Sequence, residues 1–349
     1  MTPLNQSIHL VGSVPLENSA EVFDTVCGAF GSHLRRIPDG ETGNRSRWIL
    51  FQREMLLAHP AMQLDPDGRI EPFRDLQGSV RRNHLLVLRE AVSAENNTFL
   101  PLGYVAAALD SYATFAQKQA DGDIPPHVRF QVSLPTPFAT GLFYVHPKSQ
   151  RAFIARMQAA LLTEMQQICD AIPHDKLAIQ WDCCQEILLA EGYFPADWAY
   201  VFDELFPTLG ALGNAVPSGV EVGYHLCYGS PLDEPLVRQD DLAIVVNFTN
   251  HLVDALTRPL NFIHLPVSNP QADDAFFAPL ADLTLAESAE LYLGLINPRD
   301  PEGDSHRLAA ARRYRATFGV ATECGWGRKN REQVAQLLTE HLATLSSMA

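Results

Sequence analysis

A histidine and a cysteine, His225 and Cys227, lie two residues apart in the apolar stretch GYHLCYG, and both side chains can bind a metal ion. On a β-strand, residues at i and i+2 point to the same face. Cys324 lies near the end of another strand-like run, close to the C-terminus. Imidazole and thiolate are ligands that zinc prefers, and three protein ligands with an open fourth position are typical of catalytic zinc. The alternative is a core histidine and two small buried cysteines.

The elements that would position these residues alternate between short apolar strands and amphipathic helices, which predicts a parallel sheet covered on both faces. Helical spacing is clearest over 148–171 and 330–345. The stretch 42–127 is too long for one connection, and we expect it to hold extra helices and a strand-like piece over 98–104. The eight strands are predicted at 7–15, 33–41, 128–137, 177–184, 220–229, 261–267, 291–298 and 318–325.

Eight such units predict a (β/α)₈ TIM barrel, a single domain over 1–349 with inserted helices after the second strand. Polar residues gather at the C-terminal ends of the predicted strands, where barrels of this kind carry their active sites. Arg45 lies in one such place, and its guanidinium suits a carboxylate, phosphate or sulfonate, although it fits a solvated helix equally well.

The composition limits the classes of partner that we expect this chain to bind. The 349 residues are 46% hydrophobic and 19% charged, which permits a large core, and the net charge of −15 argues against nucleic acid. The sequence shows no signal peptide and no apolar run of membrane-spanning length. Six scattered cysteines do not make a disulfide scaffold. We therefore expect a cytoplasmic protein that binds small molecules, and we leave the formation of a homo-oligomer open.

Six short motifs in order resemble the catalytic barrel of cobalamin-independent methionine synthase. GSVP (12–15) is similar to that family's GSFP, and DGETGNR (39–45) to its HGE-x-x-R. IQWD (179–182) resembles its IQ-x-D-E-P, and HLCYG (225–229) its H-x-C-Y-S. INPRDP (296–301) is similar to IHSPRIP, and ECGWGR (323–328) to DCGLKTR. The pattern of H-x-C with a distant cysteine is also similar to zinc enzymes that alkylate coenzyme M, including epoxyalkane:coenzyme M transferase.

The resemblance implies zinc bound by His225, Cys227 and Cys324. It also implies substrate contacts at Ser13, Glu41 and Asp182, which in the family hold an amino-acid thiol by its carboxylate and amine. A hydroxyl and two carboxylates suit such a polar, amine-bearing substrate. Hydrogen bonding to loops at the strand ends would explain the same three residues without a substrate.

The sequence departs from the family at positions that matter for the chemistry, among them Cys183, where the family has an acidic residue after the strand-four aspartate. The family's fourth zinc ligand, a glutamate, falls on Pro266, which has no side-chain donor. His264 lies two residues earlier on the same face and is a candidate for the fourth zinc ligand; a water molecule or the substrate thiol is the alternative ligand. His264 is also a candidate catalytic acid or base, and Asp182 is the other candidate catalytic residue. The family's catalytic histidine falls on Ile296, and we take the next residue, Asn297, as a candidate substrate contact.

Three hypotheses follow. The first is a zinc-dependent thiol S-alkyltransferase, in which a zinc-bound substrate thiolate attacks a methyl or alkyl donor. The second is a thiol-epoxide transferase or C–S lyase of the coenzyme M transferase type. The third is a barrel that binds zinc and a thiol without turning them over. Metal content and a panel of thiols and electrophiles distinguish the three.

Overall fold

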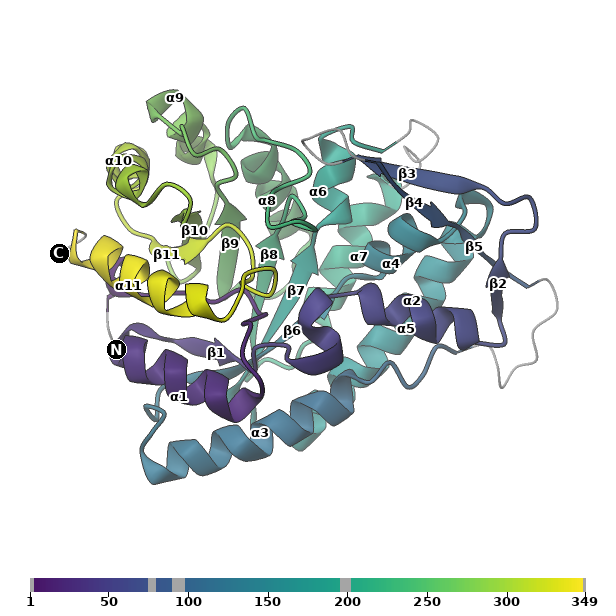
Figure 1. Ribbon diagram of the computed structural model, residues 1–349, viewed down its shortest axis with the longest axis horizontal. Coiled ribbons are helices and arrows are strands. Elements are labelled where there is room, and N and C mark those ends of the chain that lie inside the picture. The colour runs from purple at the N-terminus through teal and green to yellow at the C-terminus, as the bar shows by residue number, and fades with distance from the viewer. Residues whose placement is uncertain (1–2, 75–79, 90–97, 195–201, 348–349) are drawn as a thin grey trace.

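The structure, a computed structural model, describes residues 3–74, 80–89, 98–194 and 202–347. Its centre is a curled sheet of seven parallel strands (Figure 1). The strands from β6 onwards are buried over nearly their whole length, as their continuous apolar sequences predict. In spatial order the strands are β1 (Arg36–Pro38), β6 (Arg129–Pro135), β7 (Leu177–Cys183), β8 (Glu221–Leu226), β9 (Phe262–Pro266), β10 (Glu290–Ile296) and β11 (Gly319–Thr322).

The segment 7–14, predicted as part of the first strand, lies between the two edges of this sheet without forming a strand. Ile8 makes isolated parallel bridges to Leu34 and to Val320, and Ser13 makes one to Gly40. The backbone hydrogen bonds of the segment alternate between its two neighbours, so neither side forms a continuous ladder. The prediction of an eight-stranded barrel is therefore confirmed in part, as a curled parallel sheet of seven strands.

Helices connect the successive strands and lie outside the sheet (Figure 1). The helices predicted at 148–171 and 330–345 are confirmed as α5 (Pro147–Ala171) and α11 (Glu332–Ser346). The apolar face of α5 is buried, as its spacing requires. The other connecting helices are α1 (Ser19–Phe30), α4 (Pro137–Tyr144), α6 (Gln185–Ala190), α7 (Phe202–Asn214), α8 (Ala243–Ala255), α9 (Asp274–Phe277) and α10 (Pro301–Arg312), with short 3₁₀ turns at Leu4–Gln6, Gly31–His33, His174–Lys176 and Ala278–Asp282.

The long connection between β1 and β6 carries the helices predicted for it and also two small antiparallel sheets. Its helical parts are a 3₁₀ turn (Gly43–Arg47), α2 (Leu50–Ala58) and α3 (Tyr104–Asp121). Strand β2 (Met62–Leu64) pairs with β5 (Leu86–Leu88), and β3 (Ile70–Arg74) pairs with β4 (Val80–His84). These sheets project away from the central sheet, to the right in Figure 1.

The strand predicted at 98–104 is wrong, because Glu164 of α5 takes the backbone groups that a strand would need. Its carboxylate accepts hydrogen bonds from the four consecutive amides of residues 102–105, at 2.5–3.3 Å. These amides open α3, and a carboxylate is favourable at a helix N-terminus. Pro101 lacks an amide hydrogen to donate to a ladder. None of the helices in the described part of the chain is long and apolar enough to cross a membrane.

Candidate metal and substrate site

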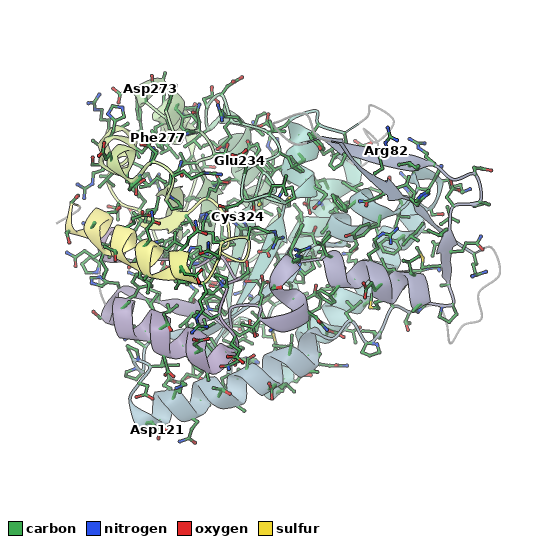
Figure 2. The ribbon with its side chains drawn as sticks, viewed as in Figure 1. Arg82, Asp121, Glu234, Asp273, Phe277 and Cys324 are labelled. Atoms are coloured by element: carbon green, nitrogen blue, oxygen red, sulfur yellow. The ribbon has the colours of Figure 1, made fainter. Side chains whose placement is uncertain are left out.

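Three possible metal ligands meet at the C-terminal edge of the sheet. His225 lies on β8, Cys227 directly follows that strand, and Cys324 follows β11; Figure 2 labels Cys324 near the middle of the view. One ligand atom from each residue lies within 4.8 Å of the others. The two sulfurs are 3.5 Å apart. The sequence separates these residues by up to about a hundred positions, and the parallel sheet brings them together.

The donor set fits a metal ion. His225 and Cys227 are buried, and Nε2 of His225 is a buried nitrogen with no hydrogen-bond partner among the described residues. Such an atom is unfavourable unless a ligand satisfies it. The pKa of the Cys227 thiol is raised by its hydrogen bond with Cys184 and by burial. The pKa of the partly buried Cys324 thiol is raised by its hydrogen bond with Cys227 and by loss of solvent. A metal ion would replace the thiol protons.

His264 lies beside the candidate ligands, and from the sequence we expected it to be a fourth ligand or a catalytic acid or base. Its Nδ1 is 2.7 Å from Nδ1 of His225, and its Nε2 is 3.0 Å from the carbonyl oxygen of Thr322. The ring is completely buried. Both nitrogens are therefore engaged with protein atoms, and neither is free to face a metal or a substrate.

Two carboxyl groups face the cavity that contains these ligands. Asp182, at the end of β7, accepts a hydrogen bond from Gln180 Nε2 at 2.9 Å. Glu41 adopts a left-handed backbone conformation (φ 46°), which non-glycine residues seldom adopt. Burial, opposed by Arg45 and assisted by Asp39, raises the pKa of Glu41 to about 7.

The Asp182 carboxyl is the second member of this pair. Burial, followed by repulsion from Glu41, raises its pKa well above the usual range. The cavity between the pair and the metal ligands has a volume of about 60 Å³. A cation would be stabilised there, because two carboxyls that resist ionisation face the same small space.

The other three residues predicted to contact a substrate lie in three different places. Ser13 lines the same cavity, and its Oγ accepts a hydrogen bond from Gly327 N at 3.2 Å. Arg45 is bound to Asp39, with 2.6 Å between Nη2 and Oδ2, so its charge acts on Glu41 from behind the cavity wall. Asn297 lines a neighbouring hollow that also contacts Cys324.

A second, larger cavity adjoins the first and was not predicted. Its volume is about 450 Å³, and it shares Trp48, Cys184 and Arg328 with the smaller cavity. Two short sequence features could have indicated this cavity: the stretch RSRW, which ends at Trp48, and the adjacent cysteines 183–184. The sequence did not show which cysteine faces the cavity: Cys184 does, whereas Cys183 is fully buried.

Comparison with known proteins shows what this fold resembles. A B12-independent methionine synthase from Shewanella sp. W3-18-1, in complex with selenomethionine, is 14% identical over 99% of this chain and 96% of its own, with a TM-score of 0.55. A methyltransferase from Methanosarcina mazei is 12% identical over 97% and 93%, with a TM-score of 0.50. A putative vitamin-B12 independent methionine synthase from Listeria monocytogenes is 16% identical over 95% and 87%, at 0.48.

No family model and no curated protein sequence matches the chain. At 12–14% identity the structural likeness shows a shared fold. The family that the six motifs resemble is thus represented among the solved structures that share the fold of this chain.

Proposed function

We propose that the protein is a zinc-dependent thiol S-alkyltransferase, with segment 7–14 completing a (β/α)₈ barrel. The observation that carries the proposal is the meeting of an imidazole nitrogen and two thiols within 4.8 Å, in one cavity with two carboxyls of raised pKa. A zinc ion would find soft ligands there, and a substrate thiol would find a place beside them.

The metal ligands in this proposal are His225 Nε2, Cys227 Sγ and Cys324 Sγ. Zinc held by them would lower the pKa of a substrate thiol and give a nucleophile near neutral pH. His225 and Cys227 come from the end of one strand, so their relative positions are fixed by β8. Cys324 lies on the loop after β11.

The amine of the substrate would lie between Glu41 and Asp182. An ammonium group there favours the ionised carboxyls and offsets the cost of their burial. The Ser13 hydroxyl oxygen accepts a hydrogen bond from the Gly327 amide, and the hydroxyl hydrogen can be donated to a substrate carboxylate. Arg45 would hold Asp39 in place without touching the substrate, and Asn297 would contact the substrate from the neighbouring hollow.

The alkyl donor would occupy the larger cavity. Its walls include the aromatic side chains of Trp48 and Phe143 and the guanidinium groups of Arg47 and Arg328. This arrangement suits an apolar group with an attached anion. Because the two cavities share Trp48, Cys184 and Arg328, a donor there would present its reactive carbon to the thiol in the smaller one.

Metal content tests the proposal. Protein purified without chelator should carry about one zinc per chain, and Cys324→Ser should lose zinc and activity. Cys27→Ser, a buried cysteine of α1, is the matched control and should keep both. Activity is measured by product formation from homocysteine, cysteine, glutathione and coenzyme M with methyl donors and epoxides.

Each hypothesis has its own outcome in this experiment. Product from methyl donors supports the alkyltransferase, and product only from epoxides supports the thiol-epoxide transferase. Zinc that responds to a thiol without any product supports a binding protein. Protein without zinc, together with Cys324→Ser that behaves like the wild type, would refute the metal site.

A further inference from the structure

A line of hydrogen-bonded groups crosses the C-terminal end of the sheet behind the metal ligands. It joins His225 on β8, His264 on β9 and the carbonyl of Thr322 on β11, with distances of 2.7 and 3.0 Å. His225 and His264 are direct neighbours in the pairing of β8 with β9. All three residues are at most 4% exposed, so water does not compete for these bonds.

The chemistry of the three groups fixes the protons. A carbonyl oxygen only accepts, so His264 carries a hydrogen on Nε2. In a neutral imidazole the other nitrogen is then an acceptor, so Nδ1 of His264 accepts from His225. His225 therefore carries its hydrogen on Nδ1, and its Nε2 is left with a lone pair. That nitrogen is buried and finds no hydrogen-bond partner in the part of the chain that the structure describes.

We propose that His264 is a positioning residue that holds His225 in the Nδ1–H tautomer and directs its Nε2 lone pair to the metal. The role in metal binding rests on the proposed function, whereas the tautomer exists without metal. Histidine ligands of metals usually donate their second nitrogen to a protein acceptor, and losing that acceptor weakens metal binding. His264 thus supports the site without being a ligand.

One further feature fits this role. Gly294 of β10 leaves space for the second bond: a Cβ there would lie 2.9 Å from His264 Nε2 and 2.9 Å from the Thr322 oxygen. A side chain at Gly294 would force these groups apart.

The first experiment measures zinc affinity by competition with a chromophoric chelator. His264→Leu removes the acceptor and should weaken zinc binding about 10–100-fold. His264→Gln keeps one acceptor and one donor at the end of the side chain and should stay closer to the wild type. His341→Leu replaces a fully buried histidine of α11 and should leave zinc affinity unchanged. Equal affinity for His264→Leu and the wild type would overturn the proposal.

The second experiment reads the tautomer directly, by long-range proton–nitrogen NMR correlations in metal-free protein labelled with ¹⁵N-histidine. Wild type and His264→Gln should show His225 protonated on Nδ1, and His264→Leu should lose this preference. Protonation of His225 on Nε2 in the wild type would disprove the proposal even if His264→Leu fails to fold. Protein that binds no zinc but shows the Nδ1–H tautomer would refute the proposed function and retain the positioning of His225.

Discussion

Replacing Glu41 with glutamine should make the stability of the metal-free protein less dependent on pH. Glu41 has an ordinary pKa of 4.5, and in the folded protein burial raises it to about 7. A raised acid pKa means that the folded state resists ionisation, so stability is lost as pH rises from about 4.5 to 7. This rise in pKa corresponds to about 3 kcal/mol, and water at the partly exposed side chain reduces the expected cost to about 1–3 kcal/mol.

Urea unfolding at fixed ionic strength between pH 5 and pH 8 measures this effect. Relative to the wild type, Glu41→Gln should gain about 1–3 kcal/mol of unfolding free energy between the two ends of the range. Removing the Glu41 charge also lessens the repulsion that raises the pKa of Asp182, which acts in the same direction.

Glu54→Gln, on the exposed face of α2, is the control and should follow the wild type at every pH. Other carboxyls of raised pKa, such as Glu186 and Glu323, are common to all three proteins and cancel in the difference. A constant difference between Glu41→Gln and the wild type from pH 5 to pH 8 would refute the reasoning.

Two further substitutions test the packing behind the site. Gly294→Ala places a Cβ 2.7 Å from Glu323 Cα and 2.9 Å from His264 Nε2. The substitution should lower the free energy of unfolding in urea by about 1–3 kcal/mol and weaken zinc binding. Wild-type values for both quantities would contradict this account. Glu164→Gln replaces one carboxylate oxygen with a donor, so part of the amides of residues 102–105 lose their acceptor. Thermal unfolding should show a loss of about 2–4 kcal/mol, and an unchanged midpoint would show that these bonds do not stabilise α3.

The sequence was sufficient for the strands that are buried on both faces, because continuous apolar runs bounded by polar residues have few other uses. It also indicated that His225, Cys227 and Cys324 would lie close together, since the C-terminal ends of parallel strands share one edge. It was less successful where pairing depends on distant partners. Segment 7–14 divides its hydrogen bonds between two neighbours, and residues 98–104 lose theirs to Glu164.

The candidate site shows the same limit at the level of single atoms. From the sequence we predicted His264 beside the candidate metal ligands, but its hydrogen bonds to His225 and Thr322 depend on the spacing of three strands. Trp48 lines both cavities and has a left-handed backbone conformation (φ 54°). The neighbouring residues in the sequence do not predict this conformation. Such features follow from tertiary packing and not from local pattern.

The bridges of segment 7–14 bear on the order in which the site can form. The hydrogen bond between Ser13 and Gly327 joins residues 314 positions apart, and Ile8 is bridged to Val320. Contacts of such separation carry a large loop-closure entropy and form late in folding. During synthesis, Ser13 therefore waits for nearly the whole chain before it meets Cys324 and Gly327. A chain that ends before Cys324 would therefore hold His225 and Cys227 without the cavity that contains the candidate site.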